Sequence, residues 1–126
     1  MQLLIDANAV LRFILQDNDE MADKVEDILN SEKVTVRNEI LAEVIYVLEK
    51  VYKYSRQQIH SAIVGFLDMP NVNPENKPVM DLAIKTYGET KLDFADTLLY
   101  AYHVIKGDRI ITFDKKLRNR LIDPLP

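Results

Sequence analysis

The sequence predicts one α/β domain with a mostly parallel central sheet, and two observations support this fold class. Short runs of β-branched and other apolar residues alternate along the chain with longer segments whose apolar residues recur at helical spacing. Each helical segment between two predicted strands is long enough to cross over a sheet, as parallel neighbours require. The 126 residues, 48% of them hydrophobic, suffice for one core and not for two. We therefore expect a single domain over residues 1–126.

The first part of the chain predicts two strands separated by two helices. Residues 3–5 are consecutive apolar residues and predict a strand buried on both faces. A helix follows through residues 10–15, and a second one, after a polar interruption, covers residues 21–30. Residues 34–36 predict the second strand. Residues 39–52 then return to helical spacing, with their apolar side chains along one face.

Capping and breaking residues mark the elements of the middle part. Ser55 is suited to cap the start of a fourth helix, which the next proline ends. Residues 71–76 predict a loop or an edge strand, because Pro74 has no N–H to donate to a second neighbour. A fifth helix is expected to begin around Pro78 and to end at Gly88.

The last part of the chain predicts a helix, a glycine stop and a strand. Apolar residues recur at helical spacing over residues 94–105, and Gly107 supplies the left-handed residue at which such a helix ends. Residues 109–113 predict a buried strand. We expect a short basic helix or turn over residues 115–119, and residues 121–122 are candidates for a last edge strand.

Composition excludes several classes of protein. The formal net charge of −4 argues against a broad basic surface for nucleic acid, although it leaves room for a local basic patch beside an acidic site. The absence of cysteine excludes disulfides, thiolate nucleophiles and cysteine-bound zinc. The N-terminus lacks the basic start of a secretory signal, and no apolar run approaches the roughly 20 residues of a membrane-spanning helix. We expect a soluble, cytoplasmic protein with no membrane association.

Four acidic residues are placed where they could converge. Asp6 and Asp114 directly follow predicted strands, and Asp96 lies in the first turn of the last long helix. Glu43 lies at the margin of the apolar face of its helix, where an ionised carboxylate needs a partner. Since ligands of parallel sheets collect at the carboxyl ends of the strands, these acids can share one rim. Helix capping or dipole compensation is the alternative for each of them except Glu43, and Asp93 is a further candidate cap.

Carboxylates gathered at one rim predict a metal site. Three or four of them repel one another and raise one another's pKa values unless a cation neutralises their charge. Oxygen ligands without histidine or cysteine suit Mg²⁺ or Mn²⁺. These ions polarise a phosphoryl oxygen and lower the pKa of a bound water, which is the chemistry of phosphodiester hydrolysis.

Four segments of the chain contain or adjoin these acids. They are LLIDANAVLRFIL at the N-terminus, ILAEVIYVL around Glu43, LDFADTLLYA around Asp96 and IITFDKKL around Asp114. Together they resemble the PIN-domain ribonucleases, in particular the VapC-type toxins of toxin–antitoxin pairs. The segments occur in the family's order and span nearly the whole chain. The resemblance implies a PIN-like three-layer α/β/α sandwich around a mostly parallel sheet of about four to five strands.

The resemblance also implies a site and its chemistry. The family's acids fall on Asp6, Glu43, Asp96 and Asp114, and Asp93 matches a further acid of this subgroup. All five would belong to a site for Mg²⁺ or Mn²⁺, with Asp93 acting through a metal-bound water or only as a cap. Glu43 would orient or deprotonate the attacking water. Such a site cleaves RNA endonucleolytically and leaves 5′-phosphate and 3′-hydroxyl ends.

Further residues support this assignment by resemblance. Asn8 and Thr112 match polar positions beside the first and last aspartates, whereas Ala7 stands where many members have threonine. Alanine at this position removes a hydroxyl group but no metal ligand. We expect four basic side chains near the site to hold flanking RNA phosphates, namely Arg12, Lys115, Lys116 and Arg118.

The resemblance implies protein partners as well as an RNA substrate. A small cognate antitoxin, similar to VapB, would lay its C-terminal segment over a groove lined by the N-terminal helices. It would place a basic side chain among the acids. A homodimer and a hetero-oligomer with the antitoxin are also implied.

Three rival functions fit parts of the sequence. An aspartyl-phosphate phosphatase or receiver domain also has an aspartate after its first strand, but the phosphatase needs a second aspartate where this chain has Asn8. A metal-free ribonuclease would use His60 and His103 as acid and base, and its cleavage would survive EDTA. A non-catalytic PIN-like module that only binds a partner would need none of the acids.

Overall fold

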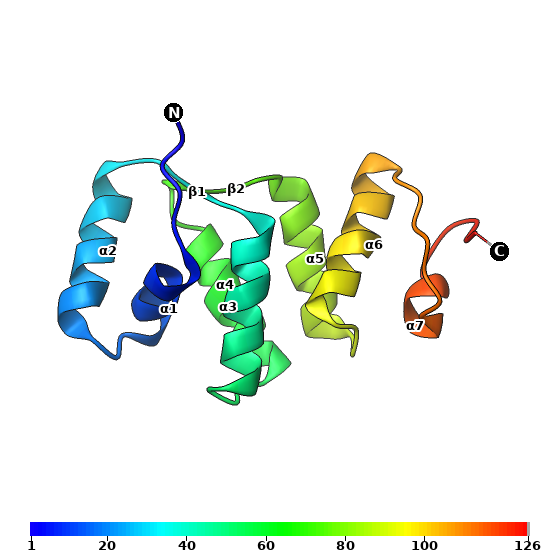
Figure 1. The fold of residues 1–126 in the computed structure, drawn as a ribbon, viewed down its shortest axis with the longest axis horizontal. Helices are drawn as coiled ribbons and strands as arrows, with labels where there is room; N and C mark the ends of the chain where they lie inside the picture. Colours follow the sequence, from blue (N-terminus) through cyan, green and yellow to red (C-terminus); the bar gives the residue numbers. More distant parts are fainter. Residues whose placement is uncertain (126) are drawn as a thin grey trace. The chain divides into compact units, whose positions relative to one another are not determined.

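The computed structural model describes residues 1–125, and the chain divides into two compact units (Figure 1). The first unit is Met1–Asn76, and the second begins at Lys77. Each unit is described by itself. Among the described residues, no helix combines the length and the apolar character that crossing a membrane requires.

The first unit contains the helices and strands expected between residues 7 and 76. Its elements are α1 (Ala7–Leu15), α2 (Asp19–Ser31), β1 (Val34–Val36), α3 (Asn38–Lys50), α4 (Arg56–Leu67) and β2 (Val72–Pro74). The predictions for these four helices are confirmed within a few residues at each end. The edge strand expected around Pro74 is also confirmed, because β2 pairs with β1 alone.

The sheet of the first unit is parallel and small. Val34 lies opposite Val72 and Val36 opposite Pro74. The N-terminal segment runs beside β1 before it turns into α1 (Figure 1), and Leu4 forms an isolated parallel bridge with Thr35. The expected strand over residues 3–5 is therefore reduced to one bridge.

The prediction that this N-terminal segment is buried on both faces is wrong. Leu3 and Leu4 keep 39% and 53% of their surface exposed. The physical reason is that β1 is only three residues long, so it offers pairing to a single residue of the segment and covers little of its side chains.

Local capping interactions fix where the helices of this unit begin and end. Gln16 adopts the left-handed conformation, with φ of 53°, and ends α1 where the polar residues begin. Ser55 Oγ accepts a hydrogen bond from the Gln58 N–H at 3.1 Å, and Gln58 Oε1 accepts one from the Ser55 N–H at 2.8 Å. This reciprocal capping box confirms the predicted start of α4.

The core of the first unit lies between its helices. α1 packs against α2 and α3, and the rings of Phe13 and Phe66 lie 6.0 Å apart. Fully buried side chains come from α1, α3 and α4, among them Val10, Leu41, Val44, Leu48, Ile59 and Ile63. These are apolar residues whose helical spacing predicted the helices, so the predicted faces are the buried ones.

The second unit consists of helices. They are α5 (Lys77–Glu89), α6 (Phe94–Lys106) and α7 (Lys115–Arg118). α5 and α6 lie side by side (Figure 1), and the rings of Tyr87 and Phe94 meet edge to face at 6.2 Å. Gly107, with φ of 74°, ends α6 as predicted. Gly88 lies inside α5, which ends one residue later.

The predicted strand over residues 109–113 is wrong for the described structure, and so is the edge strand at residues 121–122. Ile110 is buried, but Ile111 and Phe113 are 81% and 92% exposed. A β-run becomes a strand only when its backbone pairs with a neighbour, and the described part of this unit contains no other strand.

The fold class is confirmed, but the number of strands is not. The chain is α/β, with a parallel sheet flanked by helices. In place of the four to five strands expected from the resemblance, the described residues form two strands and one isolated bridge.

Candidate functional site

Asp6 caps α1 and leaves half of its carboxylate available. Its Oδ1 accepts a hydrogen bond from the Ala9 N–H at 2.9 Å, which confirms the capping interpretation. Within the first unit, Oδ2 makes no hydrogen bond to a described residue. The side chain is exposed. Capping and ligand binding are therefore compatible at this residue.

Glu43 lies on the exposed side of α3, so the prediction that it borders the buried face and needs a partner is wrong. The buried face of this helix is formed by Leu41, Val44, Ile45 and Leu48. A carboxylate outside this face keeps its contact with water and bears little desolvation cost. Burial therefore gives no argument for a site at Glu43, and its role stays a prediction.

Three of the predicted acids gather in the second unit. Partial burial, followed by the negative charges of Asp114 and Asp93, raises the pKa of Asp96 above the usual value for aspartate. Asp96 lies in the first turn of α6, as predicted. Because the two neighbouring carboxylates both act on Asp96, this unit brings together three of the five acids of the predicted site.

Asp93 occupies the N-cap position of α6 without acting as a side-chain cap. Its backbone carbonyl accepts hydrogen bonds from the N–H groups of Asp96 and Thr97, each at 3.0 Å, but its carboxylate makes no capping bond. The interpretation that capping explains Asp93 is therefore wrong. Its carboxylate adds negative charge next to Asp96 instead.

Asp114 is held from both sides by short-range hydrogen bonds. Its Oδ1 accepts from the Leu117 N–H at 2.9 Å and caps α7, whose Leu117 is buried. Its own N–H donates to Thr112 Oγ1 at 3.0 Å. Thr112 thus positions the backbone of Asp114, and its role in the site stays a prediction. Asn8, predicted as its counterpart beside Asp6, is exposed.

The donor set suits a hard divalent cation. Asp6 and Asp114 each use only Oδ1 for capping, and a carboxylate can accept with both oxygens. The raised pKa of Asp96 reflects partial burial first and then repulsion from Asp114 and Asp93, and a bound cation would favour the ionised carboxylate. Within either unit, the described residues show no group of three or more His, Asp or Glu side chains already arranged around an ion position.

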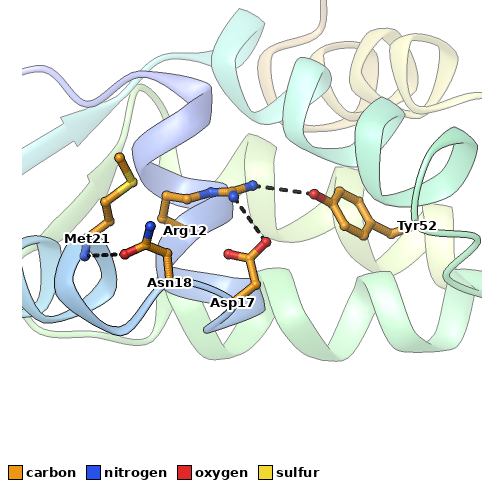
Figure 2. Close-up of polar contacts among 5 residues, drawn as sticks. All are labelled: Arg12, Asp17, Asn18, Met21 and Tyr52. Atoms are coloured by element: carbon orange, nitrogen blue, oxygen red, sulfur yellow. Dashed lines mark hydrogen bonds and ion pairs between the residues drawn. The ribbon is translucent and has the colours of Figure 1, made fainter.

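Arg12, predicted to hold phosphate, is engaged within the first unit (Figure 2). Its Nη1 lies 3.0 Å from Asp17 Oδ2, and its Nη2 donates to the Tyr52 hydroxyl at 3.4 Å. Beside it, Asn18 caps α2 by accepting from the Met21 N–H at 3.0 Å. Arg12 therefore links α1 to the loop after it and to the chain just after α3.

The other three basic candidates lie on α7. Arg118 donates to the Leu125 carbonyl oxygen and is half-buried. Lys115 and Lys116 are exposed in the turn that Asp114 caps. These two lysines are the candidates best placed to meet a phosphate next to an acidic residue of the site.

The resemblance implies a groove at the N-terminal helices, and the structure has a groove there that includes one of the acids. A groove of about 310 Å³ lies between the N-terminal segment, α1, α2 and β1. Asp6 is its charged residue, and the other lining residues are Leu3, Leu4, Ile5, Ala9, Val25, Ile28 and Val34. Residues 3–5, which the sequence predicts as a buried strand, line this groove instead.

Comparison with known proteins identifies the family. The chain matches the PIN domain family over residues 3–120. It is similar to the VapC ribonuclease of Aquifex aeolicus (strain VF5), with 31% identity over 100 residues that cover 75% of this chain and 73% of that protein. Both findings agree with the resemblance carried by the four sequence segments. The chain therefore belongs to the PIN domain family and, within it, to the VapC type.

Proposed function

We propose that this VapC-type protein is a divalent-metal-dependent endoribonuclease and the toxin of a toxin–antitoxin pair, with residues 1–126 as a single domain. Its family membership makes it a nuclease, and the VapC relative supplies the argument for RNA as the substrate. The observation that carries the metal site is the group of acids around Asp96, whose pKa is raised first by partial burial and then by the charges of Asp114 and Asp93. We place the activity in the cytoplasm, which suits a chain without cysteine.

In this proposal Asp6, Asp96 and Asp114 would hold Mg²⁺ or Mn²⁺, and Asp93 would act through a metal-bound water. A bound divalent ion supplies polarisation of the phosphoryl group and a water of lowered pKa. Asp6 and Asp114 present their free oxygen while Oδ1 keeps each carboxylate oriented by its cap. Thr112 fixes the backbone of Asp114. Exposed Glu43 orients the attacking water and accepts its proton, and the products carry 5′-phosphate and 3′-hydroxyl ends.

RNA cleavage with and without metal tests this function. The wild type should cleave RNA with Mg²⁺ or Mn²⁺ and lose cleavage in EDTA. Asp6→Asn and Asp96→Asn should each lose at least about a hundredfold in rate, because an amide is a neutral, weaker ligand. Asp68→Asn is the matched control, since Asp68 is an exposed acid at the end of α4. Full activity in both site variants would sink the mechanism.

The same assay separates the rival ribonuclease mechanism. Cleavage that survives EDTA would favour acid–base catalysis by histidine. Against that mechanism, both ring nitrogens of His103 contact main-chain atoms of its own unit. Both nitrogens of the neutral ring are therefore already engaged within the protein.

We also propose that the apolar groove next to Asp6 receives the C-terminal segment of a VapB-like antitoxin. The groove is lined mainly by aliphatic side chains, so its occupant is apolar. The neighbouring α2 exposes a run of acids, which favours an occupant that also carries basic residues. These acids are Asp19, Glu20, Asp23, Glu26 and Asp27. A basic side chain of the antitoxin would then meet Asp6.

Co-expression with the small protein encoded next to this chain tests the groove. The two proteins should co-purify, as a hetero-oligomer built on a toxin homodimer. Leu4→Asp should abolish co-purification, because Leu4 lines the groove and is 53% exposed. Val51→Asp is the control, since Val51 is an exposed apolar residue (64%) outside the groove. Equal loss with both variants would contradict the assignment of the groove.

A further inference from the structure

The imidazole of His103, near the end of α6, contacts two separate stretches of main chain. Its Nδ1 lies 2.8 Å from the carbonyl oxygen of Asp108, and its Nε2 lies 3.0 Å from the backbone nitrogen of Ile122. A carbonyl oxygen can only accept, and a backbone N–H can only donate. Nδ1 must therefore carry the proton and Nε2 must be bare, so the geometry requires the neutral Nδ1–H tautomer.

These two hydrogen bonds enclose the segment that carries Asp114. Asp108 directly follows the glycine that ends α6, and Ile122 follows α7. Between them lie Thr112 and Asp114, and the buried cluster of Leu92, Ile110 and Leu117 packs under the same segment. One ring thus fastens both ends of a stretch of chain that contains a proposed metal ligand.

The C-terminal side of this arrangement is the weaker one. Asp123 has φ of 50°, a left-handed conformation that aspartate adopts more readily than most residues but that the following Pro124 disfavours. A strained turn of this kind persists only where surrounding contacts hold it. The contacts here are the Ile122 bond to His103 and the Arg118 bond to the Leu125 carbonyl.

We propose that His103 is a positioning residue that clamps the Asp114 segment at both ends and releases its C-terminal end when the ring takes up a second proton. Protonation places an N–H on Nε2, opposite the N–H of Ile122, so that two donors face each other and this hydrogen bond breaks. The Nδ1–H bond to Asp108 is retained. The clamp thereby opens on one side only.

Charged groups around the ring oppose one another. Arg109 and Asp123 line the same small cavity as His103. Arg109 is a cation and Asp123 an anion. On α6 itself, the cationic Lys106 follows one turn later. On α7, the guanidinium of Arg118 is engaged with the Leu125 carbonyl.

Amide hydrogen exchange on the full chain, measured by NMR between about pH 8 and pH 5, tests the clamp in the range where histidines titrate. After correction for intrinsic exchange, protection of the Ile122 amide should fall about three- to tenfold on acidification, the effect of losing one hydrogen bond. At about pH 8, the nitrogen chemical shifts of the ring should show the neutral Nδ1–H tautomer. A pH-independent Ile122 amide or an Nε2–H tautomer would overturn the proposal.

Two variants separate the two hydrogen bonds. His103→Gln keeps an acceptor near the Nε2 position, so Ile122 should stay protected at every pH. His103→Asn keeps a donor near the Nδ1 position, so Ile122 should be poorly protected at every pH. His60→Gln is the control and should behave as the wild type. If His103→Asn and His103→Gln gave the same protection of the Ile122 amide, the clamp would be refuted. Should one variant fail to fold, the wild-type titration still decides.

Cleavage kinetics add a consequence that rests on the proposed function. His103→Asn should lower kcat about three- to tenfold at unchanged KM, because Asp114 is held less firmly, while His103→Gln should restore it. If no variant cleaves RNA, the proposed function fails while the exchange experiment remains decisive for the clamp. Equal kcat in all variants would confine His103 to a structural role and overturn its positioning role.

Discussion

Asp96 is a residue whose proposed role in metal binding costs the folded protein stability. Its pKa is raised first by partial burial and then by Asp114 and Asp93. A raised pKa means that the folded state binds this proton more tightly than the unfolded state. The associated stability is fully present below the unfolded pKa and is lost as the pH rises through the folded pKa. As the pH rises and the carboxylate ionises, the metal-free protein bears the free-energy cost of a charge that is partly buried beside two others.

Asp96→Asn should therefore stabilise the metal-free protein. We expect the melting temperature in EDTA at pH 7 to rise by about 1–3 °C, because the amide removes the cost of partly burying a charge and the repulsion from Asp114 and Asp93. Mg²⁺ should raise the melting temperature of the wild type and have little effect on the variant. The measurement is thermal unfolding, with Asp68→Asn as the control that changes neither value. A lower melting temperature for Asp96→Asn in EDTA would contradict this account.

At the residue level, local interactions were predictable and non-local ones were not. The caps at Asp6 and Asp114 span three residues, so the sequence already contains both partners. The contact between Arg12 and Tyr52 joins residues 40 positions apart, and no sequence pattern predicts it. The prediction that Glu43 borders the buried face of α3 fails for a related reason. The margin of a helical wheel becomes buried or exposed according to what packs against it.

Two glycines occupy different positions in their helices, and substituting each with alanine should have opposite effects on stability. Gly107 ends α6 with φ of 74°, whereas Gly65 lies inside α4, and a Cβ at either position would meet no atom within 4 Å. The difference between them is therefore conformational rather than steric. Gly107→Ala should lower the free energy of unfolding by about 1 kcal/mol, and Gly65→Ala should raise it by about 0.5–1 kcal/mol. Urea denaturation checks both, and equal signs would refute the reasoning.

Arg12 gives a second prediction at this scale, because it ties three parts of the first unit together. Arg12→Ala should lower the free energy of unfolding by about 1–2 kcal/mol, since it removes both the ion pair with Asp17 and the bond to Tyr52. Lys115→Ala, at an exposed position on α7, should leave it unchanged within about 0.5 kcal/mol. If Arg12→Ala impaired RNA binding without loss of stability, the original phosphate interpretation would be favoured.

Elements with their own end signals were predicted well. Ser55, Gly107 and the polar run after Leu15 mark helix boundaries by interactions within a few residues. The strands were predicted less well because a strand is defined by its neighbour. Residues 109–113 have the composition of a strand, and within the described part of their unit no second strand exists for them to pair with.

At the scale of the whole molecule, a net charge of −4 limits how the protein can hold RNA. A few local cations must supply the phosphate contacts, and Lys115 and Lys116 are the exposed candidates beside Asp114. For single-stranded RNA, each phosphate contact contributes about 0.7 to the slope of log affinity against log salt. Binding should therefore be modest in strength and clearly salt-dependent.

Replacing both lysines with alanine should reduce this slope by about 1.4 in the non-cleaving Asp96→Asn background. Titrations of RNA at several salt concentrations measure it. Lys53→Ala with Lys85→Ala is the matched pair, since both residues are exposed and lie away from α7, in the loop after α3 and on α5. An unchanged slope would remove the two lysines from the RNA contacts.

The groove beside Asp6 has a consequence for the life of the protein in the cell. Leu3, Leu4 and Ile28 leave 39%, 53% and 45% of their surface to water, around a segment that β1 pairs at one residue only. Apolar surface next to unpaired backbone promotes self-association. A toxin that has lost its antitoxin would therefore gain activity and become prone to aggregation and degradation at the same time. Binding of the antitoxin in the groove would then both inhibit the nuclease and protect it from aggregation. The freed nuclease would be active only until it aggregates or is degraded.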